Sequence, residues 1–228
     1  LASGIAHELG TPLNVVAGRA AMIASGEVAS WPEVREMAGV IREQSNRMVR
    51  TLRQLLDFAR RRSTERSRTD LVKLARETVA LLEPLAAKRG VAVAVKSGVL
   101  ALEAEVGAGQ IQQVLTNLVM NAIQASPASA TVEVQLAARI IASNQGDGLE
   151  RQYACVEVRD SGEGMPEDVR ARVFDPFFTT KPVGEGTGLG LSVAYGIVAE
   201  HHGWIDVSSK PGRGSVFTVW LPAGDPSA

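Results

Sequence analysis

The 228-residue sequence predicts an α+β protein in two parts, an antiparallel helical hairpin followed by an α/β sandwich. Two observations predict this division. Over the first 60 residues, apolar side chains recur at the three- and four-residue spacing of amphipathic helices. From residue 71 onward, helical and strand patterns alternate, which is typical of helices packed beside a sheet. The polar stretch 62–69 shows neither pattern, so we expect domains at 1–66 and 69–228.

The first part predicts two helices that meet along an apolar seam. The second helix extends from about Glu33 to Arg62, and a short connection between the helices makes them antiparallel neighbours. Two amphipathic helices cannot bury both of their stripes alone. We therefore expect two copies of the chain to form a dimeric four-helix bundle, with packing of the hairpin on its own second domain as the alternative. The seam residues are Ile5, Leu9, Pro12, Val16 and Ile23 in the first helix, and Val34, Ile41, Met48 and Leu55 in the second.

The second part predicts a mixed, largely antiparallel sheet flanked by helices. A Gly- and Pro-rich stretch between residues 162 and 190 is too long for an ordinary connection and is typical of a functional lid or a disordered segment. The predicted helices are 71–88, 110–125 and 188–202, and the predicted strands are 91–96, 131–141, 153–160, 205–209 and 215–221.

The composition is that of an ordinary soluble domain, with 45% hydrophobic residues, 21% charged residues and a net charge of −1. We therefore expect no nucleic-acid partner and no membrane contact by this fragment. Cys155 is the single cysteine, stands in an apolar run and is expected in the core, which suits a cytoplasmic location. Because the sequence begins at Leu1 without a methionine, we expect an upstream part to be missing. Anchoring of the full-length protein to a membrane stays open.

The first candidate site residue is His7, on the first predicted helix. The seam lies opposite it, which predicts that the imidazole faces solvent. Thr11 lies one turn further on the same face, and Glu8 lies on the flank. A neighbouring carboxylate can accept the imidazole N–H, so that the other ring nitrogen presents its lone pair as a nucleophile. The alternative is a surface histidine without a role.

A second candidate is the predicted helix 110–125, because its polar face consists of neutral amides. Amide oxygens can ligate a hard cation such as Mg²⁺, and amide nitrogens can donate to phosphate. The alternative is a neutral face that contacts another helix. The amides are Gln110, Gln113, Asn117, Asn121 and Gln124, well away from the apolar stripe of Ile111, Leu115, Leu118 and Ala122.

A third candidate is the glycine-rich region. Asp160 ends an apolar strand, where its carboxylate can accept from an exocyclic amine such as adenine N6, and Gly162 and Gly164 permit close backbone approach. A helix N-terminus that follows further glycines favours phosphate. The pattern lacks both the Rossmann G-x-G-x-x-G turn and a P-loop. These further glycines are Gly186, Gly188 and Gly190.

Together, five segments in order resemble the sensor histidine kinases of two-component systems, over nearly the whole chain. The resemblance implies a dimeric phosphoacceptor domain and an ATP-binding sandwich of the Bergerat type, shared with gyrase and MutL. One departure is Gly107-Ala108-Gly109, where many members carry an acidic residue and a proline, and it weakens the start of the helix. The segments are similar to the H box (His7–Asn14), N box (Asn117–Ala122), G1 box (Asp160–Gly164), F box (Asp175–Lys181) and G2 box (Gly186–Leu191).

The resemblance also implies roles for single residues. His7 would accept the γ-phosphoryl group of ATP, Glu8 would orient and deprotonate the ring, and Thr11 would position a water that dephosphorylates the partner. Asn121 would ligate Mg²⁺, and Asp160 would recognise adenine. The implied nucleotide-binding residues are Asn117, Asn121, Asp160, Gly162, Gly164, Lys181, Gly186, Thr187, Gly188, Leu189 and Gly190.

The sequence therefore predicts ATP-dependent autophosphorylation of a histidine, followed by transfer to an aspartate on the receiver domain of a response regulator. Phosphatase activity toward that regulator stays open. Two other functions are weighed against it. An ATP-driven conformational machine of the gyrase type does not explain an exposed His7 beside Glu8. A non-enzymatic phosphotransfer adaptor with a degenerate nucleotide site does not explain Asn121, Asp160 and the lid glycines.

Overall fold

The structure is a computed structural model that describes residues 2–28, 30–59, 65–142, 150–181 and 186–223; of these, 2–9, 50, 51, 53–59 and 142 are described by their backbone alone. The chain divides into two compact units. The first contains residues 1–62 and 176–189, and the second contains residues 63–175 and 190–228. The domain limits expected from the sequence, 1–66 and 69–228, stay a prediction.

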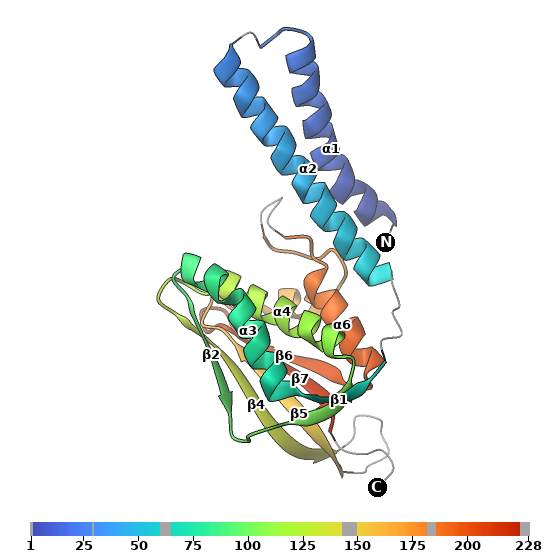
Figure 1. The fold of residues 1–228 in the computed structure, drawn as a ribbon, viewed down its shortest axis with the longest axis vertical. Coiled ribbons are helices and arrows are strands. Elements are labelled where there is room, and N and C mark those ends of the chain that lie inside the picture. The colour runs from blue at the N-terminus through green and yellow to red at the C-terminus, as the bar shows by residue number, and fades with distance from the viewer. Residues whose placement is uncertain (1, 29, 60–64, 143–149, 182–185, 224–228) are drawn as a thin grey trace. The chain divides into compact units, whose positions relative to one another are not determined.

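The first unit contains the two predicted helices, α1 (Ala2–Ala24) and α2 (Trp31–Ala59), which pack against each other as a hairpin (Figure 1). The helix α1 continues through Pro12, whose side chain is buried on the predicted seam. The start of α2 has the Ser-x-x-Glu spacing of a capping box, but the Glu33 carboxylate accepts the Ser30 hydroxyl where a complete box uses the backbone N–H. The backbone N–H of Glu33 donates to Ser30 Oγ at 3.4 Å, and the Ser30 hydroxyl donates to the Glu33 carboxylate at 2.6 Å.

The second unit is built on a five-stranded sheet with the order β2-β4-β5-β7-β6. β2 (Ala92–Ser97) is parallel to β4 (Thr131–Ala142), and every other neighbouring pair is antiparallel. The remaining strands are β5 (Glu150–Arg159), β6 (Trp204–Ser209) and β7 (Ser215–Pro222). This confirms the prediction of a mixed, largely antiparallel sheet.

Three helices cover one face of the sheet: α3 (Leu71–Lys88), α4 (Ala108–Ala125) and α6 (Gly190–Glu200) (Figure 1). A short helix, α5 (Glu167–Arg172), lies within the stretch predicted as a lid, where no helix was predicted. The apolar stripe of α4 faces the core as predicted. All four of its residues are buried: Ile111, Leu115, Leu118 and Ala122.

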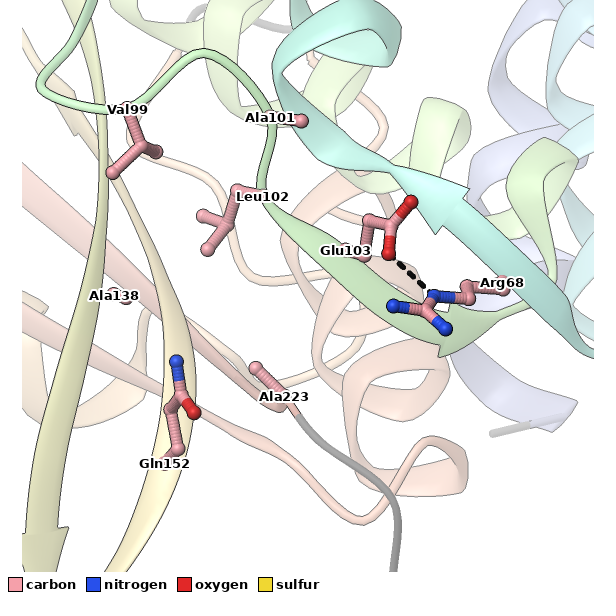
Figure 2. A pocket seen from close by; sticks show the side chains of 8 residues that line it. All are labelled: Arg68, Val99, Ala101, Leu102, Glu103, Ala138, Gln152 and Ala223. Atoms are coloured by element: carbon pink, nitrogen blue, oxygen red, sulfur yellow. Dashed lines mark hydrogen bonds and ion pairs between the residues drawn. The ribbon is translucent and has the colours of Figure 1, made fainter.

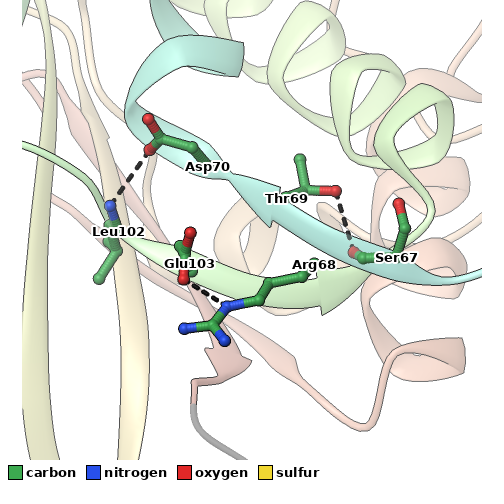
Figure 3. A network of polar contacts seen from close by, with 6 residues as sticks. All are labelled: Ser67, Arg68, Thr69, Asp70, Leu102 and Glu103. Carbon is green, nitrogen blue, oxygen red and sulfur yellow. Dashed lines mark hydrogen bonds and ion pairs between the residues drawn. The ribbon is translucent and has the colours of Figure 1, made fainter.

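A two-stranded ribbon completes the second unit. β1 (Ser67–Asp70) and β3 (Glu103–Val106) pair antiparallel, although the sequence predicted a boundary at 62–69 and no strand near 103. Figure 3 shows Asp70 on β1 and its bond to Leu102, the residue before β3. Its carboxylate Oδ1 accepts the backbone N–H of Leu102 at 3.1 Å and caps α3 by accepting that of Val72 at 2.9 Å.

The face of the sheet opposite the helices carries an aromatic cluster. Trp204 and Trp220 are stacked with ring centroids 5.6 Å apart, and Tyr153 meets Trp204 edge-on at 4.9 Å. Both indole N–H groups donate to Asp206 Oδ2, at 3.1 and 2.8 Å. Cys155 pairs with Trp220 across β5 and β7 and is buried, which confirms its predicted place in the core. Burial raises the pKa of its thiol to about 11.

Candidate nucleotide and phosphoacceptor site

The amide face of α4 is half-buried and meets the helix α6 at two places. Asn117 Nδ2 donates to the carbonyl oxygen of Gly190, the first residue of α6, at 2.9 Å. Gln110 Nε2 donates to the Glu200 carboxylate at the other end of α6, at 3.3 Å. The alternative interpretation, a neutral face against another helix, therefore holds for these two amides. Asn121 lies one turn beyond Asn117 on the same face.

Asp160 follows β5 and is buried, with 5% of its surface exposed. Its Oδ1 accepts the backbone N–H of Gly162 at 2.8 Å and that of Ser215 at 3.2 Å. Within the described residues, no hydrogen bond reaches Oδ2. Burial raises the pKa of this carboxyl above its usual value of 3.8, against the lowering effect of the two hydrogen bonds. The side chain is thus a fixed acceptor in a poorly solvated place.

The backbone around Asp160 is held by two glycines that have no room for a side chain. A Cβ on Gly162 would lie 2.4 Å from the carbonyl oxygen of Ala125, at the end of α4. Gly164 has φ +68°, and a Cβ there would lie 2.0 Å from the carbonyl oxygen of Lys210 in the β6–β7 turn. From the sequence, these glycines were expected to shape the nucleotide pocket. The structure shows that close packing against other backbone segments of the chain also requires glycine at both positions.

The face of α4 that carries the asparagines links these two places. Asn117, Asn121 and Ala125 are four residues apart, so they lie along one side of the helix over about 12 Å. Asn117 contacts Gly190 at one end of this side, and Ala125 lies against Gly162 at the other. The structure therefore brings the predicted amides, the start of α6 and the Asp160 turn together in the second unit.

Residues 176–189 of the predicted lid belong to the first unit, whereas 162–175 and Gly190 belong to the second. The backbone N–H of Phe177 donates to the carbonyl oxygen of Gly188 at 3.0 Å, which closes the loop. Phe177 has φ +68°, which strains a bulky residue, and Gly188 has φ +64°. A Cβ on Gly186 would lie 2.6 Å from Thr179 Oγ1 and 3.2 Å from Lys181 Cδ, so Lys181 and Gly186 are neighbours. Thr187 is half-buried and Leu189 is buried.

The predicted phosphoacceptor residues lie on α1. The side chains of His7 and Glu8 lie outside the part of the chain that the structure describes, so the exposure of the imidazole stays a prediction. Thr11 is half-buried.

No helix among the described residues is long and apolar enough to cross a bilayer.

Two serines that the sequence analysis missed support the Asp160 turn. Ser209 Oγ accepts the backbone N–H of Met165 at 2.8 Å and donates to the carbonyl oxygen of Gly214 at 2.9 Å. The Ser215 hydroxyl lies 3.0 Å from that of Ser209. The available signal was the Pro-Gly-x-Gly turn between two predicted strands, which contains the left-handed Gly212 and Gly214.

A buried histidine was also missed. The backbone N–H of Gly107 donates to His201 Nε2 at 3.0 Å, and His201 Nδ1 lies 2.8 Å from the carbonyl oxygen of Ile197. These partners require Nε2 as acceptor and Nδ1–H as donor, which is a neutral tautomer. Burial lowers the pKa of this imidazole below 6.5.

A hollow of about 370 Å³ opens beside the β1–β3 ribbon (Figure 2). It combines apolar walls with the ion pair between Arg68 and Glu103. No residue of the predicted nucleotide site lines it. Its lining residues are Arg68, Val99, Ala101, Leu102, Glu103, Ala138, Gln152 and Ala223.

Comparison with known proteins places both parts of the chain. Residues 107–225 match the family described as histidine kinase-, DNA gyrase B-, and HSP90-like ATPase. Residues 1–64 match the His Kinase A (phospho-acceptor) domain.

Curated relatives align with nearly the whole chain. It is 34% identical to the sensor kinase CckA of Brucella abortus over 226 residues, which cover 97% of this chain and 24% of that protein. It is also 34% identical to the sensor histidine kinase ZraS of Escherichia coli over 222 residues, which cover 97% of this chain and 45% of ZraS. The chain thus spans less than half the length of either relative.

Among solved structures, the histidine kinase ThkA in complex with the response regulator protein TrrA superposes with a TM-score of 0.74 and 25% identity. The match covers 98% of this chain and 61% of that one. Together with the two family matches, these likenesses show that the chain belongs to the histidine kinase-, DNA gyrase B- and HSP90-like ATPases and, through its phospho-acceptor segment, to the sensor histidine kinases.

Proposed function

We propose that this chain binds ATP with Mg²⁺, transfers the γ-phosphoryl group to His7, and passes it to an aspartate on the receiver domain of a response regulator. The observation that carries the proposal is the alignment along α4 of the two asparagines between the start of α6 and the Asp160 turn. We place the phosphoacceptor part at 1–66 and the ATP-binding part at 69–228.

Asp160 is proposed to recognise the adenine ring. Its Oδ2 can accept the exocyclic N–H of adenine while Oδ1 remains bonded to the backbone of Gly162 and Ser215. The glycines Gly162 and Gly164 let the turn fold tightly against its neighbours, so the acceptor is preorganised before the nucleotide arrives.

Asn121 and Asn117 are proposed to lie beside the phosphates. The residues fit Mg²⁺, because one amide oxygen suffices when water and phosphate oxygens complete the octahedron. When bound, the ion would neutralise charge on the transferred group. Gly190 begins α6, where free backbone N–H groups favour phosphate. We propose that the other lid residues cover the nucleotide: Lys181, Gly186, Thr187, Gly188 and Leu189.

His7 is proposed as the nucleophile. One ring nitrogen forms the new N–P bond as the bond between the γ-phosphorus and the bridging oxygen breaks, and ADP leaves with that electron pair. Glu8 accepts the proton from the other ring nitrogen. The carboxylate of the regulator aspartate then takes the phosphoryl group, and the imidazole is regenerated. Thr11 is proposed to position a water that hydrolyses the aspartyl phosphate of the regulator, which releases inorganic phosphate.

A homodimer is proposed because α1 and α2 leave apolar side chains uncovered within the chain. Trp31 is 76% and Leu52 50% exposed. A response-regulator partner is supported by the solved complex of ThkA, a protein of the same family. Because the reaction consumes ATP, we propose that this fragment works in the cytoplasm.

The test is incubation of the chain with Mg²⁺ and γ-labelled ATP. We expect acid-labile label on the wild-type protein, none on His7→Gln, and full labelling of His202→Asn. The control removes an exposed histidine, and asparagine tolerates the positive φ of 59° at that position. Label that persists on His7→Gln would overturn the assignment. Steady ATP hydrolysis without labelling would favour the gyrase-like machine.

A further inference from the structure

The helix α4 begins without a cap of its own. Its N-cap residue is Gly107, which has no side chain to accept a free backbone N–H, and a second glycine, Gly109, follows within the first turn. Glycine is tolerated at an N-cap, but here no side chain bonds the free N–H groups, and Gly109 adds the conformational cost of a glycine inside a helix. Yet this helix carries Asn117 and Asn121, whose positions matter most for the proposed phosphate chemistry.

His201 supplies part of what this start lacks. Its Nε2 accepts the backbone N–H of Gly107, and both residues are buried. In a capping box, the third helical residue makes this contact. Here that residue is Gln110, whose amide nitrogen instead donates to Glu200. The N-terminus of α4 is therefore held by the chain just beyond α6.

A second hydrogen bond ties the same two helices together, from Asn117 Nδ2 to the carbonyl oxygen of Gly190. The two bonds enclose ten residues of α4 and eleven of α6, or about 15 and 16.5 Å along the helix axes. The spacing between the two bonds is thus nearly the same along α4 and along α6, as expected for two antiparallel helices. We call the bonds Gly107–His201 and Asn117–Gly190 the two rungs between these helices. A slip of one residue, about 1.5 Å, would break both rungs.

We propose that His201 is a positioning residue of the ATP site: its neutral imidazole fixes the register of α4 against α6 and so holds Asn117 and Asn121 relative to the start of α6. This inference rests on the proposed function. Without the His201 rung, only the 3.3 Å bond between the Gln110 and Glu200 side chains holds this end of α6 to α4. Because that bond joins two flexible side chains, we expect α6 to shift, and small displacements of binding groups are costly.

Only the neutral ring can serve in this way, because an imidazolium would present a second N–H to the N–H of Gly107. The buried setting lowers the pKa of His201, which supports a neutral ring. The hydrogen bond to Ile197 and the charge of Glu200 raise this pKa, whereas the charges of Arg66 and His202 lower it together with burial. The Arg66 guanidinium also donates to the carbonyl oxygen of Glu200, at the end of α6.

The experiment compares three variants of the 228-residue chain with wild type: His201→Ala, His201→Gln and Trp220→Leu. Glutamine keeps one acceptor and one donor. Trp220→Leu is the matched control, because it loses the stacking and the Asp206 contact on the face of the sheet opposite the helices. Binding of the ATP analogue AMPPNP is measured by calorimetry, and stability by urea unfolding.

We expect His201→Ala to raise the Kd for AMPPNP about tenfold, which is about 1.4 kcal/mol. His201→Gln should stay within about threefold of wild type, and Trp220→Leu should lose stability without a change in Kd. Equal Kd values for His201→Ala and Trp220→Leu would overturn the inference, and so would a glutamine variant that binds as weakly as alanine. Wild-type protein that does not bind AMPPNP would instead contradict the proposed function.

If His201→Ala does not fold, amide hydrogen exchange decides through His201→Gln. We expect the Gly107 amide to be protected in wild type and to keep most of that protection in the glutamine variant. A Gly107 amide that exchanges freely in wild type would overturn the inference.

Discussion

The hairpin and the sandwich treat their apolar residues differently. In the sandwich, the helix stripes and one sheet face enclose a continuous core in which Leu118 and Val134 are completely buried. In the hairpin, the seam residues Val34, Ile41 and Met48 are only half-buried, and Leu52 is exposed. The sandwich therefore has its own core, whereas the hairpin needs a further surface to cover its stripes. That surface is proposed to be a second copy of the chain.

The largest expected effect comes from Leu118→Ala, which opens a cavity beneath α4. We expect the unfolding free energy of the sandwich to fall by about 3 kcal/mol. Urea unfolding followed by tryptophan fluorescence measures this loss, because Trp204 and Trp220 belong to the sandwich. If the dimer depends on the hairpin alone, this variant should dimerise as the wild type does when both are measured by light scattering under native conditions. Loss of the dimer together with the core would show that the two regions are not independent.

Leu52→Glu attacks the hairpin instead. A charge at this exposed apolar position of α2 should weaken the proposed dimer about a hundredfold, which is about 2.7 kcal/mol. Analytical ultracentrifugation over a range of concentrations measures the dissociation constant. The matched control is Leu81→Glu on α3, where leucine is 69% exposed and belongs to the sandwich. A control that dissociates the dimer equally would contradict the assignment of the interface to the hairpin.

Asp160→Asn should separate nucleotide binding from stability within the sandwich. The amide oxygen can still accept from Gly162 and Ser215, and the uncharged group avoids the desolvation that raises the pKa of the acid. We expect stability to be maintained or to rise, while the Kd for AMPPNP rises about tenfold. Asp206→Asn, on the opposite face, should leave the Kd unchanged. Unaltered binding in Asp160→Asn would remove this residue from the site.

A smaller effect is expected from pH. The pKa of His201 is lowered in the folded state, so the unfolded chain binds its proton more readily. The contribution is therefore fully present above the ordinary pKa of 6.5 and is lost as the pH falls from there toward the folded pKa. Urea unfolding at pH 7.5 and 5.5 should show a decrease that His201→Gln reduces. An equal decrease in that variant would assign the effect to other groups.

Elements with a strong period were predictable. The stripe of α4 and the alternation of β4 and β7 follow from the sequence, because each pattern is repeated over several turns or residues. The helix predicted at 188–202 is shorter in the structure, where it begins at Gly190 and ends at Glu200. Gly188 and His202 have φ of +64° and +59°, and the helix cannot continue through left-handed residues.

Short elements were not predictable, because pairing with a segment distant in the sequence, and not a local pattern, determines whether they form. β1 has four residues, and its pairing joins Ser67 to Val106 across a complete helix and strand. The same holds for the site. Asp160 and its glycines were found from the local pattern, but the β6–β7 turn that supports them comes about 50 residues later. His201 stood in the sequence as one of three histidines, and only its contact with Gly107 gives it a role.

Gly164 and Gly214 carry a consequence for how such chains diverge. Gly164 lies in the turn after Asp160, and a Cβ on it would meet the carbonyl oxygen of Lys210 in the β6–β7 turn. Gly214 lies in the β6–β7 turn, and a Cβ on it would meet the carbonyl oxygen of Asp160. A methyl group on either one would force the loops apart and shift the carboxylate between them. We therefore expect the two turns to change together in evolution. A homologue with a larger residue in place of one glycine should also differ in the backbone of the opposite turn.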